Sequence, residues 1–546
     1  MLGLMQDWPL NVSSILDFAA KYHPNRRIVS RTIEGPIVET NWAGIKTKAL
    51  KCAEALRSVG TVPGDRIGVM AWNTARHLEV WYGVSGCGAI LHSLNPRLFD
   101  DQLIYIINHA EDRFVMLDVT EVPLMERIAD RLETVERFII LTDRAHMPET
   151  TLKGALCYED WVAGQSTENG WTPVPELSAA GICYTSGTTG NPKGVVYSHR
   201  SHVLHAMTVM QPDLLGLSSR DVVMPVVAMF HANGWSTAFS SPAAGAGMVL
   251  PGRDMSPAAL YELLEHGVTI TLAVPTVWLP LLRYLEETGK NFATLKRVVI
   301  GGSACPRAVM EAFQDAYGVD VIHAWGMTET SPLGSFATLT PETDVADRET
   351  VMATKLKAGR PFYTVDLKII DEAGAELSWD GEVSGRLMIR GPGVLRRYLK
   401  QDQDVVDDEG WFDTGDVASI DPNGFIRITD RSKDVIKSGG EWISSIDLEN
   451  LAVGHPGVAE AAAIGVAHPK WDERPILVVV KAEGMDPSAE EIRAHVASGV
   501  AKWQVPDDVI FVDEIPHTAT GKISKVTIRE QLRAMNYALP EARGAA

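Results

Sequence analysis

The chain has 546 residues, more than one hydrophobic core supports, so two or more domains are expected. Hydrophobic residues make up 45% of the sequence and charged residues 22%, a composition typical of folded rather than disordered proteins. The formal net charge of -20 argues against a nucleic-acid-binding protein, because such proteins contact phosphates through lysine and arginine. The five widely spaced cysteines include no C-x-x-C pair, which indicates free thiols in a reducing compartment.

Neither a secretory leader nor a membrane-spanning segment is predicted. The first sixteen residues contain Asp7 and have no basic segment followed by a long apolar run, as a secretory signal would have. The most apolar stretch, 268–282, is interrupted by Pro275 and Pro280 and is shorter than the roughly 20 apolar residues of a spanning helix. We therefore expect a cytoplasmic protein without stable membrane insertion.

Short apolar runs alternate with longer amphipathic ones after residue 65. The pattern predicts strands at 66–72, 89–95 and 113–118, with helices at 75–89 and 100–111 between them. Strands and helices in alternation imply a parallel sheet that is covered by helices. The first part of the chain is therefore predicted to be an α/β domain.

The same pattern returns in the middle of the chain. Buried strands are predicted at 269–275, 297–303 and 320–326, each ending in glycine, proline or a small polar residue. Ligands of open α/β sheets bind outside the carboxyl ends of the strands. These three strand ends are therefore candidates for a ligand site.

Two changes of pattern divide the rest of the chain. Residues from about 359 to 429 are rich in glycine and β-forming residues, with a turn signal at 422–424, and predict a β-rich subdomain. A charged segment then precedes a compact α/β pattern. We expect an N-terminal domain of residues 1–431 and a separate small domain of residues 432–546, with a hinge near Lys433.

The strongest local signal is the segment YTSGTTGNPKG at 184–194. Its glycines let the backbone bring N–H groups toward an anion, its hydroxyls add donors and Lys193 adds a charge. It is not a Walker A loop, because Pro192 intervenes and Gly194 follows the lysine. A flexible surface turn is the alternative. The candidate phosphate-binding residues are Thr185, Ser186, Gly187, Thr188, Thr189, Gly190 and Lys193.

This segment resembles the phosphate loop of the adenylate-forming enzymes, a family that includes acyl-CoA synthetases, luciferases and peptide-synthetase adenylation domains. The resemblance continues, in the family's order, through HAWGMTE at 323–329, WFDTGD at 411–416, DRSKD at 430–434 and PHTATGK at 516–522. It implies an α/β fold, with a large N-terminal domain of stacked doubly wound sheets, a β-rich subdomain and a small mobile α+β C-terminal domain.

The implied activity is that of an ATP-dependent acyl-CoA synthetase. Such an enzyme forms an acyl-adenylate and then an acyl-CoA thioester, with release of pyrophosphate and AMP, and uses Mg²⁺, ATP and coenzyme A. By resemblance, Glu329 and Thr185 face the metal, whose remaining oxygen ligands come from phosphates and water. Glu329 also fits a plain structural role, as an acid at a helix start after Thr328.

An adenine ring needs flat apolar faces, which the small residues at 301–304 and the Trp325 plane offer. Asp416 is suited to accept both ribose hydroxyls, with Arg431 as a nearby donor, although it is also a plausible turn residue. The other nucleotide-binding candidates are Gly302, Ser303, Ala304, His323, Ala324, Gly326, Met327 and Thr328.

By resemblance, Lys522 is the adenylation lysine that bridges the substrate carboxylate and the α-phosphate, and the other catalytic candidates are Glu329 and His231. A solvated loop lysine is the alternative for Lys522. Two residues depart from the family pattern. Many members have arginine or lysine at the position of His517, and many have arginine at the position of Lys525. The family rotates its small domain about a hinge, which predicts hinge and CoA-side residues Lys433, Asp434, Lys437, Gly439, Gly440, Glu441 and Trp442.

The acyl pocket is expected beside the segment FHANGW at 230–235, with His231 near the carboxylate and Trp235 as a wall. A bulky indole shortens a pocket and favours a small or medium acid. This segment and 242–252 resemble bacterial ligases for medium-chain acids and for 3-(methylthio)propionate, and we expect one of these substrates. The pocket candidates are Trp235, Gly302, Met327 and Pro332.

Three other functions compete with this interpretation. A hydrolase could use Ser236, although the motif at 234–238 has alanine where a nucleophile elbow has glycine. An adenylation enzyme could deliver to a protein carrier, and a regulator could bind ATP without catalysis. His199, His202 and His205 lack an accompanying carboxylate or thiol, so we expect a helix after the phosphate loop rather than a metal site. By analogy with the family, a homodimer is expected.

Overall fold

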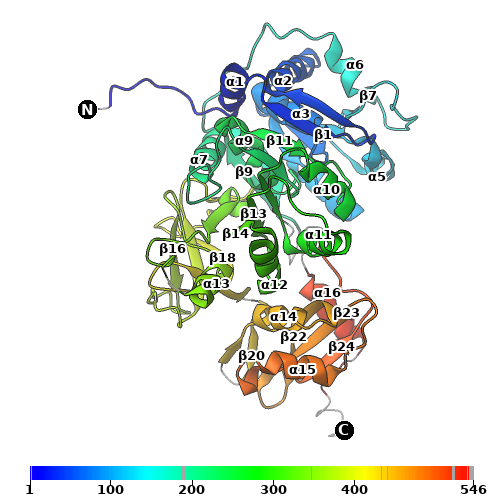
Figure 1. The fold of residues 1–546 in the computed structure, drawn as a ribbon. Helices are drawn as coiled ribbons and strands as arrows, with labels where there is room; N and C mark the ends of the chain where they lie inside the picture. Colours follow the sequence, from blue (N-terminus) through cyan, green and yellow to red (C-terminus); the bar gives the residue numbers. More distant parts are fainter. Residues whose placement is uncertain are drawn as a thin grey trace.

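A computed structural model covers the chain, and it describes residues 1, 3–185, 191–345, 347–431, 433–438, 441–518, 523–535, 537 and 539 (Figure 1). These residues form four β-sheets, two large and two small. The two large sheets and the helices around them form the upper part of the molecule in Figure 1, whereas the last sheet lies at the opposite end.

The first large sheet has seven strands, of which all but the last pair run parallel. In spatial order they are β7 (Leu156–Cys157), β6 (Arg137–Ile140), β5 (Asp112–Leu117), β3 (Arg66–Met70), β4 (Ile90–Ser93), β8 (Ala179–Tyr184) and β9 (Gly194–Ser198). Helices α3 (Ala75–Gly86) and α4 (Asp100–Ala110) connect strands, as the alternating sequence pattern predicts.

The second large sheet has eight strands and is parallel except at its two edges. In spatial order they are β15 (Leu333–Phe336), β14 (Asp320–Gly326), β13 (Arg297–Gly301), β12 (Ile270–Ala273), β10 (Val222–Pro225), β11 (Gly247–Leu250), β1 (Arg27–Arg31) and β2 (Ile37–Asn41). The three strands predicted in the middle of the sequence are β12, β13 and β14, so their carboxyl ends lie side by side.

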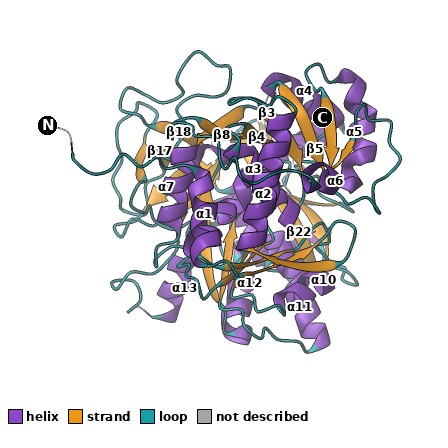
Figure 2. Cartoon of the chain, turned by 90° about the horizontal axis from the view of Figure 1, so that it is seen from above, coloured by secondary structure: helices purple, strands orange, loops and turns teal. Residues whose placement is uncertain are grey.

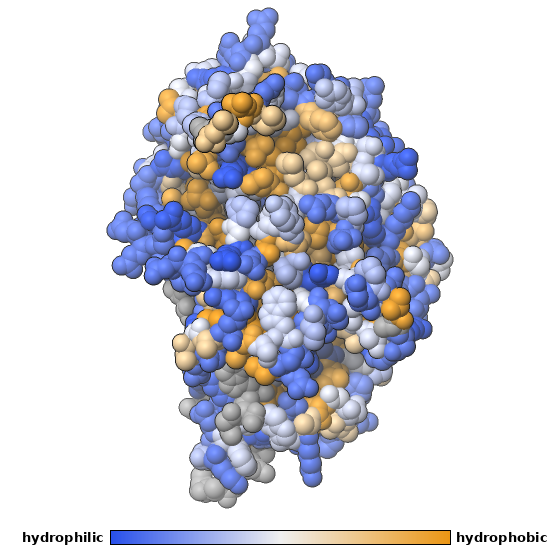
Figure 3. Space-filling view, turned by 90° about the vertical axis from the view of Figure 1, so that its left-hand side faces the viewer, coloured by the Kyte–Doolittle hydropathy of each residue, from blue (hydrophilic) through white to orange (hydrophobic). Residues whose placement is uncertain are grey.

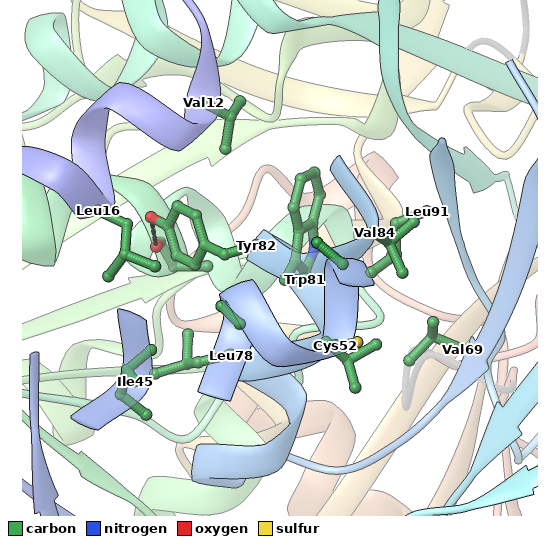
Figure 4. Close-up of a cluster of buried hydrophobic side chains, with 14 of the residues drawn as sticks. Val12, Leu16, Ile45, Cys52, Val69, Leu78, Trp81, Tyr82, Val84 and Leu91 are labelled. Carbon is green, nitrogen blue, oxygen red and sulfur yellow. Dashed lines mark hydrogen bonds between the residues drawn. The ribbon is translucent and has the colours of Figure 1, made fainter. Parts of the chain in front are cut away.

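A shared core joins the two large sheets. One cluster of buried side chains includes Val69 of β3 and Met248 of β11, together with Trp81 of α3. Figure 4 shows Trp81 and Tyr82 in the middle of this cluster, with the Tyr82 hydroxyl donating a hydrogen bond to the Ala238 carbonyl oxygen at 2.8 Å. Helices thus fill the space between the sheets, which explains the stacked arrangement seen from above in Figure 2.

The remaining helices of the two-sheet body cover its faces and edges. They are α1 (Val12–Tyr22), α2 (Trp42–Ser58), α5 (Val122–Ile128), α6 (Tyr158–Ala163), α7 (His199–Val209), α9 (Thr237–Ala244), α10 (Pro257–Leu264), α11 (Pro275–Thr288), α12 (Arg307–Glu311) and α13 (Arg348–Leu356). A short segment, α8 (Ala232–Trp235), has left-handed rather than α-helical backbone angles at its centre. Within the described ranges, no helix has the length and apolar character needed to cross a membrane.

The β-rich region forms a four-stranded antiparallel sheet beside the second large sheet (Figure 1). Its strands are β16 (Asp366–Ile370), β17 (Gly385–Arg390), β18 (Phe412–Ile420) and β19 (Ile426–Arg431). Its own cluster of buried side chains includes Ile369, Leu387 and Ile426. This antiparallel sheet matches the β-rich pattern seen in the sequence.

The last sheet has five strands and lies beyond the predicted hinge. Its elements are β20 (Ile436–Ser438), β21 (Glu441–Ile443), β22 (Val458–His468), β23 (Asp472–Lys481) and β24 (Asp508–Phe511), with helices α14 (Ser445–Val453), α15 (Ala489–Ala497) and α16 (Lys525–Ala534). The predicted α/β fold, with a large N-terminal part and a smaller C-terminal part, is confirmed. The boundary at residues 431 and 432 and the mobility of the smaller part stay predictions.

All five cysteines are buried and have free thiols, as their spacing predicts. Burial raises the pKa of the Cys87 and Cys183 thiols to about 11 and that of Cys305 to about 12. Because the thiolate is the reactive form of cysteine, these side chains are chemically inert in the folded chain.

Candidate adenylation site

A cavity of about 1530 Å³ lies where the second large sheet, the β-rich sheet and the C-terminal sheet meet. In β13 and β14, Gly301 pairs with Ala324, so the segments that follow Ile300 and flank Ala324 meet at one edge of the sheet. The cavity brings together many of the nucleotide-site candidates: Gly302, Ser303, Ala304, His323, Ala324, Trp325, Gly326, Asp416 and Arg431. Segments more than a hundred residues apart in the sequence therefore form one wall.

Two neighbouring side chains hold the Asp416 carboxylate of β18 in this wall. Its side chain is almost fully buried, and Oδ1 lies 2.9 Å from Nε of Arg431, its cross-strand neighbour on β19. The other carboxylate oxygen, Oδ2, accepts a hydrogen bond from Trp325 Nε1 at 2.9 Å. The sequence indicated Arg431 as a donor near Asp416, but it predicted neither the ion pair with Arg431 nor the hydrogen bond from Trp325.

The Trp325 ring is also fixed from its other side. A methyl group added at Gly334 would lie 2.7 Å from Cζ3 of Trp325, so the ring packs directly on the backbone there. Gly302, which follows the neighbouring strand β13 and also lines the cavity, has a φ of +80°, a conformation that favours glycine. A small-residue face and an indole therefore line the same cavity, as a planar base requires, although contact with adenine stays a prediction.

Glu329 lies beside this cavity rather than in its lining. It belongs to a short 3-10 turn, Thr328–Thr330, and only 7% of its surface is exposed. Its Oε1 accepts a hydrogen bond from the hydroxyl of Tyr398 at 2.8 Å, and the Nζ of Lys193 lies 5.0 Å from the centre of the Tyr398 ring. Burial and the nearby Glu329 charge raise the pKa of Tyr398, which keeps its hydroxyl a donor. Sequence reasoning missed Tyr398.

The phosphate-loop candidates lie at the end of the β8–β9 hairpin. Tyr184 pairs with Gly194, and the Thr185 backbone N–H donates to the Lys193 carbonyl oxygen at 2.9 Å. These bonds close the base of the loop, so both flanking candidates, Thr185 and Lys193, are held at the end of the sheet. The central candidates fall outside the described residues: Ser186, Gly187, Thr188, Thr189 and Gly190.

We expect Glu329→Ala to weaken the use of Mg²⁺-ATP while the chain stays folded. The change removes the carboxylate that we assign to the metal and leaves the Tyr398 hydroxyl without this acceptor. Titration of Mg²⁺ against adenylation rate should show a several-fold higher requirement in the variant. Tyr398→Phe is the matched control, since it removes only the hydroxyl. A normal Mg²⁺ titration for Glu329→Ala would contradict the assignment.

The three histidines after the candidate phosphate loop are buried in the protein interior. Helix α7 begins at His199, after strand β9, as predicted. The centre of the His202 ring lies 5.4 Å from that of Trp81 and 4.5 Å from that of Phe239. His205 Nε2 accepts a hydrogen bond from the Leu333 N–H at 3.2 Å. Burial lowers the pKa of His199 and His205 to about 4. In the described part of the chain, no group of three histidine, cysteine or acidic side chains is placed to hold a metal.

The flanks of the predicted lysine loop open onto the same cavity as the nucleotide candidates. Lys522 itself is outside the described residues, but His517 and Ile523, which pair with each other as an isolated bridge, both line the cavity. Of the predicted hinge residues, Asp434 lines the cavity and forms an ion pair with Arg529 at 2.7 Å.

Three CoA-side candidates lie on paired strands after the predicted hinge: Lys437 on β20, and Glu441 and Trp442 on β21. Lys437 and the preceding residues of β20 pair with β21, where Lys437 faces Trp442 in the register. Gly439 and Gly440 are outside the described residues, and only the backbone of Glu441 and Trp442 is described. The Lys437 side chain, which is described, does not line the cavity.

A hydrogen-bonded network crosses the predicted hinge at Lys433. Asp430, at the end of β19, accepts hydrogen bonds from the backbone N–H and the hydroxyl of Ser445, at 2.8 Å and 2.5 Å. Lys525 donates to the same Ser445 hydroxyl and lies 2.8 Å from Glu449 Oε1. The sequence showed Lys525 only as a departure from the family pattern and gave no sign of this buried network.

Among the acyl-pocket candidates, Trp235 lies against Gly301 and Gly302. A methyl group added at Gly301 would lie 3.2 Å from Cη2 of Trp235, and one at Gly302 would lie 3.7 Å from its Cζ2, so the indole ring covers these two glycines. The Met327 N–H donates to the Pro332 carbonyl oxygen at 2.9 Å. His231 stacks edge-on against Phe230, with ring centres 4.7 Å apart.

The surroundings of Ser236 argue against a serine hydrolase. Its side chain is 2% exposed, and its Oγ has no hydrogen-bond partner among the described residues. A serine nucleophile needs a general base within hydrogen-bond reach. The observed geometry therefore gives Ser236 no activated role.

The sequence is similar to those of known proteins over nearly its whole length. A model of the AMP-binding enzyme family matches residues 16–399, and one of the AMP-binding enzyme C-terminal domain matches residues 447–522. The 3-methylmercaptopropionyl-CoA ligase of Ruegeria pomeroyi is 50% identical over 98% of this chain and 99% of its own length. The medium-chain-fatty-acid–CoA ligase of Ectopseudomonas oleovorans is 46% identical over 97% of each chain.

The structure of an anthranilate CoA ligase in complex with anthranoyl-AMP superposes with a TM-score of 0.86. The two proteins share 25% sequence identity, and the match covers 97% of this chain and 100% of the other. The extent of the family match and the identity to full-length relatives leave one assignment: the chain belongs to the family of AMP-binding enzymes.

Proposed function

We propose that this chain ligates a small carboxylic acid to coenzyme A in two steps at one site. In the first step the acid and ATP form an acyl-adenylate and pyrophosphate. In the second step the CoA thiol takes the acyl group and AMP leaves. The observation that supports this proposal most is that Gly302, Trp325 and Asp416 line the same cavity as the flanks of the Lys522 loop. Relatives that are 46–50% identical are named as acid–CoA ligases.

In the adenylation step, a carboxylate oxygen of the acid attacks the α-phosphorus and the bond to the pyrophosphate oxygen breaks. Negative charge increases around the α-phosphate, so positioning and charge stabilisation dominate the catalysis. We assign the bridging cation to Lys522, the ribose contact to Asp416 and the position near the acid's carboxylate to His231. Asp416 is suited to its role because Trp325 and Arg431 fix the carboxylate.

Magnesium fits the donors that the chain provides. Glu329 offers a carboxylate oriented by Tyr398, and Thr185 offers a hydroxyl at the base of the phosphate loop. Mg²⁺ is commonly bound by one or two protein oxygens, with phosphates and water completing its octahedron. When bound, the ion neutralises phosphate charge, while these two side chains locate it.

The two steps require different faces of the C-terminal part. Residues beside Lys522 line the cavity in the observed arrangement, which suits the first step. Presenting Lys437 and the loop that follows it to the acyl-adenylate requires rotation of residues 432–546 about Lys433 and Asp434. The presence of Lys522 at the position of the family's adenylation lysine favours a two-step ligase over a regulator that only binds ATP.

For the acid we propose 3-(methylthio)propionate or another short to medium-chain acid. The Trp235 ring over Gly301 and Gly302 narrows the space beside the proposed reaction centre. Two relatives, 50% and 48% identical, carry the name 3-methylmercaptopropionyl-CoA ligase. The test is a panel of acids from three to twelve carbons, with and without a thioether, scored for CoA-dependent AMP formation. A preference for the longest acids would overturn the substrate proposal, and thioester hydrolysis without ATP would overturn the ligase.

We expect Trp235→Ala to move the preference toward longer acids. Loss of the indole leaves room for extra methylenes, each worth up to about 0.8 kcal/mol when fully buried, and removes ring contacts with a short thioether acid. The measurement is kcat/KM for a four-carbon and an eight-carbon acid in both proteins, with Trp411→Ala, just before β18, as control. An unchanged ratio would place Trp235 outside the acyl pocket.

We also propose a cytoplasmic homodimer that contacts its partner through the N-terminal segment. Leu4, Met5 and Trp8 are largely exposed, and Phe18 and Tyr22 of α1 are partly exposed. In Figure 1 this segment extends toward the left-hand side of the molecule. Figure 3 views that side and shows apolar side chains gathered on its upper part. Light scattering of the full chain, compared with a variant in which Leu4, Met5 and Trp8 are serine, tests this arrangement.

A further inference from the structure

The segment that carries Trp235 has an unusual backbone. The five consecutive residues 232–236 all have positive φ angles, between 41° and 69°. Only one of them, Gly234, is glycine. Other residues resist this left-handed conformation because Cβ approaches the following carbonyl oxygen. Such a turn persists only where the surrounding structure holds it, and turns of this kind concentrate at functional sites.

Asn233 connects the turn to the protein core. It is 2% exposed, and its Oδ1 accepts a hydrogen bond from Nε1 of Trp81 at 3.2 Å. Trp81 is fully buried in α3 and packs edge-on against Phe239, with ring centres 4.7 Å apart (Figure 4 shows its position). The donor is therefore a rigid ring in the largest hydrophobic cluster, and it fixes the centre of the left-handed turn.

Further hydrogen bonds hold the chain within the turn and before it. On the far side, the Thr237 hydroxyl donates to the Gly234 carbonyl oxygen at 2.7 Å. On the near side, fully buried Asn73 accepts the Met229 N–H at 2.6 Å and donates to the Val227 carbonyl oxygen at 2.9 Å. While these groups hold the flanking residues, the bond from Trp81 restrains Asn233, two residues before Trp235.

We infer that Asn233 and Trp81 are positioning residues for the acyl pocket. Their hydrogen bond holds the left-handed turn, the turn sets the depth of the Trp235 ring over Gly301 and Gly302, and this depth sets the accepted chain length. The inference rests on the proposed role of Trp235 as the pocket wall. It assigns chain-length selectivity to a side chain of α3 that lies in the hydrophobic core, behind the turn.

The test removes this hydrogen bond in two variants, one that loses the donor and one that loses the acceptor. Trp81→Phe keeps an aromatic ring but loses the donor, and Asn233→Gly tolerates a positive φ but loses the acceptor. Each variant should shift the kcat/KM ratio of eight-carbon to four-carbon acid upward by about two- to tenfold, the range expected for one lost hydrogen bond. The double variant should equal either single variant, and the KM for ATP should stay unchanged.

Trp278→Phe is the matched control. Trp278 is also fully buried, but it belongs to the other large core, and its Nε1 has no hydrogen-bond partner among the residues described. This variant loses the same volume without losing a hydrogen bond, so its selectivity ratio should equal that of the wild type. Thermal unfolding of every variant separates positioning from general loss of stability.

Combining each variant with Trp235→Ala tests whether Asn233 and Trp81 act through the Trp235 ring. In that background, Asn233→Gly and Trp81→Phe should produce no further change in the ratio. Unchanged ratios in the single variants, additive shifts in the double variant, or shifts that persist without Trp235 would each overturn the inference. If Trp235→Ala itself leaves the ratio unchanged, the proposed acyl wall is wrong instead. Trp81→Phe carries the same test if Asn233→Gly does not fold.

Discussion

Lys522→Ala is expected to lower the rate of acyl-adenylate formation by at least about 100-fold, the usual loss when one stabilising group is removed from a transition state. The physical reason is that negative charge concentrates around the α-phosphate as pyrophosphate leaves, and the proposed bridging cation is then missing. His517 and Ile523, which flank the lysine loop, line the cavity beside Asp416. Acid-dependent release of pyrophosphate measures this step.

The same variant should keep thioester formation from supplied acyl-adenylate, because we assign Lys522 to the first step alone. Lys470→Ala is a suitable control, since Lys470 is exposed on the C-terminal part and is absent from the described lining of the cavity. Equal loss of both half-reactions would contradict the division of roles, and a normal adenylation rate would remove Lys522 from the mechanism.

Lys525→Met is expected to destabilise the C-terminal part by about 3–5 kcal/mol, the cost of removing one partner from a buried ion pair. Side-chain exposure is 11% for Lys525 and 15% for Glu449, so the remaining carboxylate has little access to water. Burial already raises the pKa of both Glu449 and Asp430, and the Lys525 charge is what opposes that rise. Removal of the cation takes its compensating charge away from two buried acids.

The free energy of unfolding, measured with urea, checks this result. Lys525→Arg keeps the charge and should lose much less stability, although a planar guanidinium cannot reproduce the contacts of an ammonium group in full. Because Ser445 also binds Asp430 across the hinge, the Met variant should in addition change the balance between the two half-reactions. Wild-type stability in Lys525→Met would show that the pair contributes nothing to the fold.

Much of the fold could be predicted from periodicity alone. Strands β3, β4 and β5 and helices α3 and α4 lie where apolar runs alternate with amphipathic ones, because those patterns reflect burial on a sheet and on a helix face. The strand predicted at 320–326 ends at Gly326 as expected, and the strand predicted at 297–303 ends two residues early, at Gly301. Motif order then indicated that these ends and Asp416 belong to one site, and the cavity confirms that they lie together.

The side-chain partners within the site could not be predicted in this way. Tyr398 binds Glu329 from 69 residues away, and neither sequence pattern points to the other. The left-handed turn at 232–236 was also missed, since four of its residues are not glycine and ordinary turn signals therefore fail. Both features arise from tertiary packing, which no local pattern encodes.

The five buried thiols make the proposed domain rotation open to direct observation. All native cysteines lie at or before Cys305, so residues 432–546 contain none. A single cysteine introduced at an exposed position such as Lys470 would therefore react with a maleimide dye ahead of every native thiol. With a second dye at an exposed position of the large part, such as Glu133, the distance between the dyes would report each turn of the catalytic cycle as a change in energy transfer.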